Sequence, residues 1–166
     1  MKKVLIIRHA KSSWATIGQR DFDRPLNERG LHDAPEMARR LIRKNVLVDA
    51  FISSEANRAL TTTRRMMKEM KMSDNQLIVL PELYHAPPSV ILSSIQKADD
   101  NFKTIAVVCH NPGITEFANM IQALSIDNVP TCAVLALQAD VKEWKEISIK
   151  NLRYEFFDYP KRSDKI

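Results

Sequence analysis

The sequence predicts an α/β fold of three layers, in which helices cover both faces of a central and mostly parallel sheet. Short runs of branched apolar residues alternate with longer segments of helical periodicity, and this alternation is typical of doubly wound folds. The 166 residues fit one domain, residues 1–166, that is long enough to bury a core. With 45% hydrophobic and 27% charged residues, the composition excludes a disordered chain.

Six apolar runs are expected to form strands. Lys3–Arg8 is almost continuously apolar and should be buried on both faces of the sheet. The run TIAVVC is the clearest buried strand, and Pro81 ends the third. The expected strands are residues 3–8, 49–53, 76–80, 104–109, 133–138 and 144–149, of which the last two should pair.

Four segments between these runs are expected to be helices. In the first, apolar residues from Leu31 to Ile42 recur at helical spacing, and in the third Pro88 suits a first turn. The expected helices are residues 27–44, 56–70, 88–97 and 112–124. Residues 150–166 form a polar tail whose four aromatic residues indicate no particular element.

The bulk charge selects no partner by itself. The net charge is +5 and the pI is about 9.3, but Lys and Arg are spread along the chain rather than gathered in one basic arm. No apolar run approaches the ~20 residues that a spanning helix needs, and the run from Val4 to Ile7 is too short for a signal peptide. We therefore expect a cytoplasmic protein in which Cys109 and Cys132 are buried free thiols.

Three of the expected strands end in residues capable of chemistry. The first ends at Arg8-His9, the second is followed by Ser53-Ser54 and then Arg58, and the fourth is followed by His110-Asn111. In open α/β sheets, ligands bind at the carboxyl ends of the strands. Two histidines and two arginines should therefore converge at one edge of the sheet.

This combination suits phosphoryl transfer. Arginine forks match phosphoryl oxygens, and a neutral imidazole can attack phosphorus and hold the group covalently. Nearby Arg charges disfavour the imidazolium form and keep His9 nucleophilic. The helices that follow Ser54 and Asn111 add backbone N–H groups at their N-termini.

Metal and nucleotide motifs are missing from the chain. The histidines and Cys109 have no helical His-x-x-x-His or Cys-x-x-Cys spacing, and arginines beside them would repel a cation. Neither the glycine-rich P-loop motif nor the dinucleotide-binding glycine fingerprint is present, and three glycines are too few to expect them. We expect no metal and no cofactor.

An ordered series of motifs resembles the histidine phosphatase superfamily, and in particular its SixA-type phosphohistidine phosphatase branch. The matches run in the expected order from residue 4 to about residue 115, roughly two-thirds of the chain. They are Arg8-His9-Ala10, the segment from Arg24-Pro25-Leu26 to Gly30, Ser53-Ser54 with Arg58-Ala59 and Thr62, Leu80-Pro81-Glu82-Leu83, and His110-Asn111-Pro112.

The resemblance implies a phosphoglycerate mutase-like fold and a role for each matching residue. His9 would be the nucleophile that carries a phosphohistidine intermediate. Arg8, Arg58 and His110 would hold the phosphoryl oxygens. Arg24 would be a further phosphate contact, although in the segment QRDFDRP it could instead pair with Asp21 or Asp23.

The source of a proton for the leaving group stays open at this point. Glu82 falls where larger members of the superfamily carry a general acid, and His85 is the second candidate. An imidazole leaving group, with a pKa near ~6.5, departs with little help, whereas an alkoxide must be protonated. Asn111 could bind substrate, orient His110 or only cap the next helix.

The sequence thus predicts a metal-independent phosphatase acting on phosphohistidine of a partner protein, because no long insertion is available to build a lid. One alternative is a phosphatase of a small phosphate ester that uses Glu82 as general acid. Another is a non-catalytic module that binds phosphate or nucleic acid through the basic edge. We expect a monomer that binds neither nucleic acid nor membrane.

Overall fold

A six-stranded sheet forms the centre of the computed structural model, which describes residues 1–162. The strand order is β3-β2-β4-β1-β5-β6. Strands β1 to β4 are mutually parallel, whereas β5 runs antiparallel to both β1 and β6. The bounds are β1 Lys2–Arg8, β2 Ala50–Ser53, β3 Leu77–Val79, β4 Thr104–Cys109, β5 Val134–Ala139 and β6 Arg153–Asp158.

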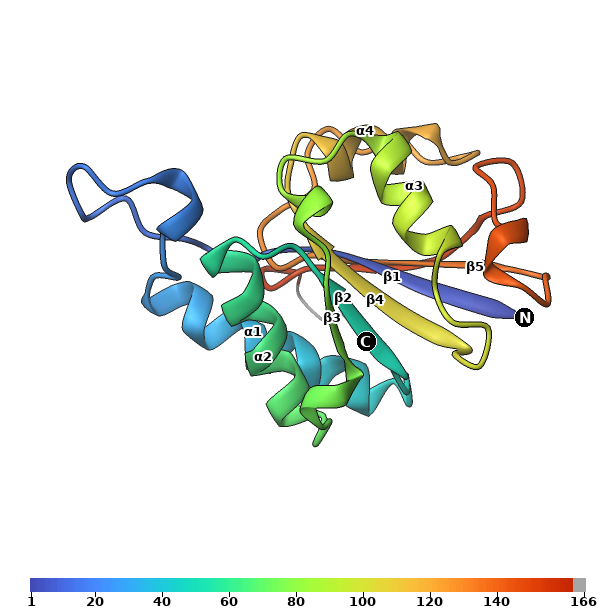
Figure 1. The fold of residues 1–166 in the computed structure, drawn as a ribbon, viewed down its shortest axis with the longest axis horizontal. Coiled ribbons are helices and arrows are strands. Elements are labelled where there is room, and N and C mark those ends of the chain that lie inside the picture. Colours follow the sequence, from blue (N-terminus) through green and yellow to red (C-terminus); the bar gives the residue numbers. More distant parts are fainter. Residues whose placement is uncertain (163–166) are drawn as a thin grey trace.

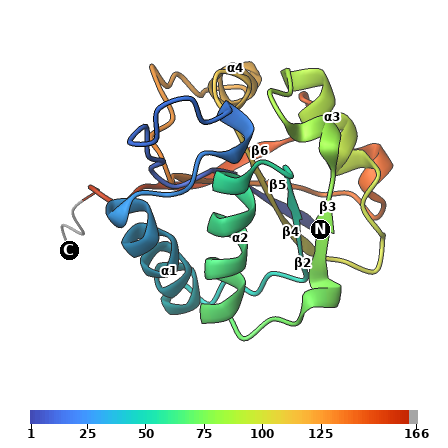
Figure 2. The same ribbon diagram turned by 60° about the vertical axis from the view of Figure 1, so that its left-hand side comes forward.

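Helices cover both faces of this sheet, as the alternating pattern predicts (Figures 1 and 2). Helices α1 and α2 lie side by side on one face, and α3 and α4 lie on the other. Their bounds are α1 Glu28–Arg43, α2 Asn57–Glu69, α3 Pro88–Gln96 and α4 Gly113–Met120. Two separate apolar clusters fill the spaces above and below the sheet. The predicted three-layer α/β fold is confirmed.

The helix that follows the first loop illustrates how local sequence sets the element bounds. The Asn27 side chain accepts a hydrogen bond from the Gly30 amide at 2.9 Å and caps α1. Strand β1 is buried from Val4 to Ile7 and contributes side chains to both apolar clusters. Its continuous apolar run therefore reflects burial on two faces.

The prediction of a strand over residues 144–149 is wrong. Trp144–Glu146 form a short 3-10 helix, η4, in which the side chains of Glu143 and Glu146 make a capping box. Trp144 is buried and donates from its indole nitrogen to the carbonyl of Phe102 at 3.0 Å. The partner of β5 is instead β6, which lies in the segment predicted as a tail. The last four residues of that tail lie outside the described residues.

The fourth helix is shorter than predicted, because α4 ends at Met120 rather than near Leu124. The Asn119 side chain exchanges two hydrogen bonds with the backbone of Ile126, at 2.7 and 2.8 Å. Ala123 also adopts a positive φ of 69°. The chain after α4 therefore turns back as a loop towards β5.

The register of the sheet brings the expected site residues to one edge. Arg8 is paired with Cys109 across β1 and β4, and Ser53 is paired with Val108 across β2 and β4. The residues that follow these pairs, His9, Ser54 and His110, therefore leave the sheet together. Among residues 1–162, no helix has the length and apolar character that crossing a membrane requires.

Candidate active site

A polar cavity of about 210 Å³ lies at the carboxyl ends of β1, β2 and β4. It brings together six of the seven residues that the sequence predicts for the site, and Glu82 is the exception. The lining residues are Arg8, His9, Lys11, Ser12, Trp14, Arg24, Arg58, His110, Asn111 and Thr131. Four cationic side chains and, among residues 1–162, no carboxylate line the cavity, which therefore suits an anion.

His9 presents its Nε2 atom to the cavity with a defined tautomer. Its Nδ1 lies 2.8 Å from the carbonyl oxygen of Ala10, which can only accept, so we assign the ring proton to Nδ1. Nε of Arg58 donates to Nε2 at 3.3 Å. Nε2 thus carries a lone pair rather than a proton, as attack on an electrophile requires.

Both buried histidines are held in their neutral forms. Burial lowers the pKa of His9 to about 3; the hydrogen bond to Ala10 opposes this shift, and the charges of Arg58, Arg8 and Arg24 add to it. Burial also lowers the pKa of His110 to about 2, with further contributions from His9 and Arg58. At neutral pH an uncharged His9 can act as a nucleophile.

Two buried N–H groups face no protein acceptor. Nε2 of His110 lies 2.8 Å from Ser54 Oγ, and that oxygen already accepts from the amide of Ala56 at 3.3 Å. Among residues 1–162 the Ser54 hydroxyl has no other acceptor, so we assign it as donor to Nε2, which places the His110 proton on Nδ1. Within the described residues, His110 Nδ1 and Arg8 Nε are buried without a hydrogen-bond partner. Such donors suit the oxygens of a bound anion.

Asp21 connects the arginines of the site and was not among the predicted site residues. Its carboxylate accepts hydrogen bonds from Arg58 Nη2 and Arg24 Nη1, both at 3.0 Å, and from the Tyr84 hydroxyl at 2.6 Å. Partial burial raises the pKa of Asp21, but these three hydrogen bonds outweigh it and hold the pKa well below its usual range. Asp21 therefore stays ionised and fixes both guanidinium groups.

Arg24 lines the cavity and is supported from several sides. Its Nε donates to the carbonyl of Ser13 at 3.1 Å and its Nη2 donates to Ser12 Oγ at 2.5 Å. The indole of Trp14 stacks on the guanidinium, with 3.2 Å between Cζ and the ring centroid. The pairing with Asp21 that the sequence offered as an alternative therefore exists within the site itself.

Glu82 does not reach the cavity, contrary to its predicted place among the site residues. It is exposed in the short helix η3, Pro81–Leu83, and no hydrogen bond or ion pair joins its carboxylate to another residue among positions 1–162. His85 lies closer than Glu82 to the residues of the site, in contact with Asp21. Its Nε2 is 3.3 Å from Asp21 Oδ2, and its ring centroid is 5.8 Å from that of His110. A positive φ of 54° turns the chain at this point.

Asn111 lines the cavity, but its amide is occupied by the protein. Its Oδ1 accepts from the amide and hydroxyl of Thr115, and its Nδ2 donates to Val129 at 3.0 Å. Nη1 of Arg8 donates to the same Val129 carbonyl at 2.9 Å. Asn111 thus holds the loop on which Arg8 rests. Nowhere in residues 1–162 do three or more His, Cys, Asp or Glu side chains gather as a metal site would require.

The fold and site agree with comparisons to known proteins. Residues 4–84 match the family model of the histidine phosphatase superfamily, branch 1. A SixA crystal structure from Agrobacterium tumefaciens is 28% identical, with a TM-score of 0.78 over 96% of this chain and 99% of that one. The protein histidine phosphatase SixA complexed with tungstate is 20% identical, with a TM-score of 0.77 over 93% and 95% of the two chains.

One curated relative matches most of the sequence. An uncharacterized chloroplastic protein of Arabidopsis thaliana is 30% identical over 155 residues, which cover 87% of this chain and 70% of that protein. The fold and cavity define a phosphatase of the phosphoglycerate mutase-like class. The chain belongs to the histidine phosphatase superfamily, in its SixA-type branch.

Proposed function

We propose that this phosphatase transfers a phosphoryl group to Nε2 of His9 and then to water, without a metal. The observation that carries the proposal is the position of the Nε2 lone pair in a cationic cavity, beside two buried N–H donors that have no protein acceptor. Nε2 forms a bond to phosphorus while the bond from phosphorus to the leaving group breaks. Water then adds to phosphorus and the N–P bond breaks, which restores His9 and releases phosphate and a proton.

Each predicted binding residue has a role in this scheme. Arg8, Arg58 and Arg24 would bind the equatorial oxygens, and His110 would donate to one of them from Nδ1. Asn111 would act by holding the loop beneath Arg8. Because His9 is already neutral, no base is needed to activate it.

We further propose that the substrate is phosphohistidine on a partner protein. The cavity is small, and within the described residues 1–162 no carboxylic acid lines it to protonate a poor leaving group. An imidazole, with a pKa near ~6.5, is a leaving group that such a site can expel. The SixA neighbour named as a protein histidine phosphatase supports the same substrate class.

A phosphoenzyme trap tests the mechanism. Wild type and His9→Ala would be quenched within milliseconds of mixing with a radiolabelled aryl phosphate in the presence of a chelator. We expect a covalent label that is acid-labile, alkali-stable and absent from His9→Ala. The matched control is His32→Ala, because the His32 side chain is 73% exposed on α1 and should not change the label.

A phosphohistidine peptide then tests the substrate class. Turnover of that peptide, with loss of turnover in His9→Ala, would support the proposal. If neither the aryl phosphate nor the peptide labels the enzyme or is hydrolysed, the catalytic proposal is wrong and a phosphate-binding module becomes the better interpretation.

A further inference from the structure

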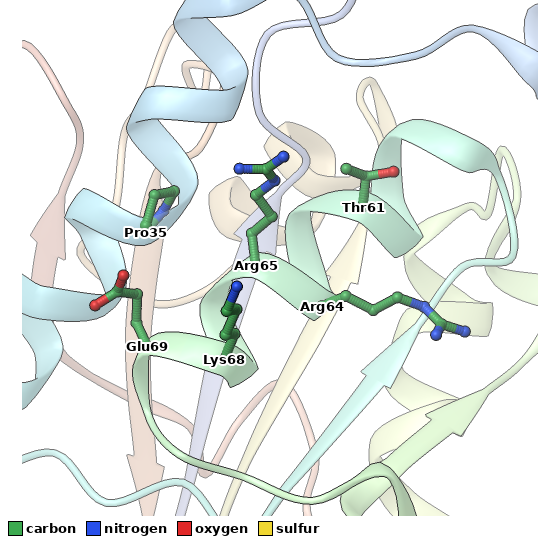
Figure 3. A pocket seen from close by; sticks show the side chains of 6 residues that line it. All are labelled: Pro35, Thr61, Arg64, Arg65, Lys68 and Glu69. Carbon is green, nitrogen blue, oxygen red and sulfur yellow. The ribbon is translucent and has the colours of Figure 1, made fainter.

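A second hollow, larger than the catalytic cavity, lies between α1 and α2. It has a volume of about 400 Å³ and is lined by Pro35, Thr61, Arg64, Arg65, Lys68 and Glu69. Figure 3 shows Arg65 and Lys68 rising between the two helices, whereas Arg64 extends away from α1. We name this hollow the α1–α2 groove.

The groove carries positive charge that the protein does not neutralise. In the described part of the chain, no carboxylate forms an ion pair with Arg64, Arg65 or Lys68, and all three are exposed. Glu69, the acidic lining residue, is 3.2 Å from Arg39 and already paired there. Arg64 and Lys68 also line a neighbouring hollow that contains Asp74. Of these three cations, Arg65 lines the α1–α2 groove but not that neighbouring hollow.

The catalytic cavity and the α1–α2 groove lie at successive positions along α2, because Arg58 lines the cavity whereas Arg65 and Lys68 line the groove. Arg58 and Arg65 are seven residues apart, so they lie on the same side of the helix with about 10 Å of axial rise between them. Lys68 lies about 15 Å along the same axis from Arg58. Thr61, which also lines the groove, donates from Oγ1 to Asn57 Oδ1 at 3.1 Å, and Asn57 at the start of α2 donates to the Asp23 carbonyl at 3.0 Å.

This geometry suits an acidic segment of a protein whose phosphoryl group occupies the catalytic cavity. An extended chain spans ~3.3 Å per residue, so carboxylates about three to five residues from the phosphorylated side chain reach Arg65 and Lys68. A free phosphate ester too small to span that distance gains nothing from these cations. The ring of Pro35 supplies an apolar wall that makes no demand for hydrogen bonds.

We propose that the α1–α2 groove is the docking surface for an acidic segment of the phosphoprotein substrate, with Arg65 and Lys68 as its main contacts. The proposal rests on the proposed function, because it assigns a specificity surface to the same catalytic site. A protein substrate would contact this surface away from the reacting atoms, whereas a small phosphate ester would not.

Two matched phosphohistidine peptides test this proposal. One carries Asp and Glu for about six residues on both sides of the phosphohistidine, and the other carries Asn and Gln at the same positions, which keep the shape and remove the charge. Exposed ion pairs are individually weak, so at low ionic strength we expect wild type to prefer the acidic peptide about 5- to 30-fold in kcat/KM. The preference should shrink towards unity in about 0.5 M salt.

Reversing the charge of the two groove residues then tests whether the preference for the acidic peptide depends on them. In Arg65→Glu with Lys68→Glu, the ratio of kcat/KM between the two peptides should fall to about one or below. The control is Lys97→Glu with Lys103→Glu, which makes the same change in net charge at two exposed positions outside the groove, after α3 and before β4, and should keep the wild-type ratio. If the reversed variant does not fold, Arg65→Gln with Lys68→Gln provides the same comparison.

The outcomes separate the two proposals. Hydrolysis of both peptides at equal rates by wild type, or an equal loss of preference in the control variant, overturns the docking surface and leaves the proposed function intact. If wild type hydrolyses neither peptide, the proposed substrate class fails, and the docking proposal fails with it. If a single-stranded RNA binds wild type but not the reversed variant, and the peptides show no preference, the groove is a nucleic-acid site.

Discussion

Asp21 Oδ2 lies 3.0 Å from Nη2 of Arg58, and the same Arg58 donates from Nη1 to the Asp21 backbone carbonyl at 2.7 Å. This double contact ties the loop after β1 to the first turn of α2. It also fixes the guanidinium whose Nε faces His9. A residue of the loop thus sets the geometry of the nucleophile without lining the cavity.

We predict that Asp21→Asn lowers kcat about 10- to 100-fold. The substitution weakens hydrogen bonds to two guanidinium groups, and bonds to charged groups contribute about 1.5–3 kcal/mol each. The loss should appear in kcat rather than in the Ki of phosphate, because removal of a negative charge also strengthens attraction of the anion. Steady-state kinetics with an aryl phosphate and phosphate inhibition measure both quantities.

The control for this change is Asp23→Asn, because Asp23 pairs with the exposed Arg20 at 2.8 Å rather than with a site arginine. Asp23→Asn should stay within about threefold of wild type, since exposed pairs contribute little. Equal losses in the two variants would contradict the positioning role of Asp21.

The buried histidines predict a loss of stability in mild acid. The folded-state pKa is about 3 for His9 and about 2 for His110, against about 6.5 in the unfolded chain. Between these values the unfolded state binds more protons, so stability falls as the pH falls from about 6.5 towards 3. From pH 6.5 to 5.0 we expect each histidine to remove roughly 1.5 kcal/mol from the free energy of unfolding.

Urea unfolding of wild type, His9→Asn and His110→Asn at pH 6.5 and 5.0 measures this effect. Each variant should lose less stability between the two pH values than wild type does. His32→Asn, at an exposed position, should keep the wild-type difference. A wild-type protein equally stable at both pH values would show that these histidines are not held neutral.

Gly30, the last residue of the motif that begins at Arg24, packs against the backbone of Lys11, which lines the cavity. A Cβ atom at position 30 would lie 2.2 Å from the backbone oxygen of Lys11, so the loop that carries Lys11 would have to move. We expect Gly30→Ala to lower the free energy of unfolding by about 1–3 kcal/mol despite the better helix propensity of Ala. Glu28→Ala, at an exposed position of the same helix, should change stability little in the same urea titration.

The sequence predicts the parts of this protein that depend on strong local patterns. Strand β4 has its predicted bounds, and α1 agrees to within one residue at each end with the helix predicted over residues 27–44. The residues at the ends of β1, β2 and β4 converge because these strands are neighbours in the sheet and run parallel. Gly30, which the motif contains without a stated reason, is explained by the approach of the Lys11 carbonyl.

The remaining features depend on contacts between distant segments, which periodicity does not encode. Asp21 meets Tyr84 across 63 positions, so its place in the site is visible only once η3 is positioned. Residues 146–150 alternate in polarity as a strand does, yet Trp144 just before them is buried in the core and bonds to Phe102. Motif position suggested Glu82, whereas the positive φ at His85 turns the chain so that His85 faces Asp21.

His85 is therefore expected to serve as proton donor when the leaving group needs one. We predict that His85→Gln lowers kcat about 100-fold on an alkyl phosphate and less than about threefold on a nitrophenyl phosphate, whose leaving group departs unprotonated. Glu82→Gln, with an exposed side chain outside the cavity, should leave both rates near wild type. A selective loss on the alkyl phosphate in Glu82→Gln instead would assign the acid to Glu82.

Ser54 is predicted to control the tautomer of His110. Its hydroxyl lies 2.8 Å from Nε2 and, as donor, keeps the ring proton on Nδ1, where no protein acceptor competes with a phosphoryl oxygen. Ser54→Ala removes that donor, so the proton is free to move to Nε2 and the cavity loses an N–H. Because groups that orient a site residue typically change activity by about 10- to 100-fold, we expect a loss of at least tenfold in kcat/KM.

Nitrogen-15 chemical shifts of His110 separate this effect from a general loss of packing. In wild type they should report a neutral ring protonated at Nδ1, and in Ser54→Ala a mixture or the opposite tautomer. Ser53→Ala is the matched control, because Ser53 is equally buried but donates to the Ser54 carbonyl at 2.8 Å and does not touch His110. Both variants should lose stability, since each gives up a buried hydrogen bond, but only Ser54→Ala should change the tautomer. An unchanged tautomer together with a tenfold loss of activity would show that Ser54 acts by packing alone.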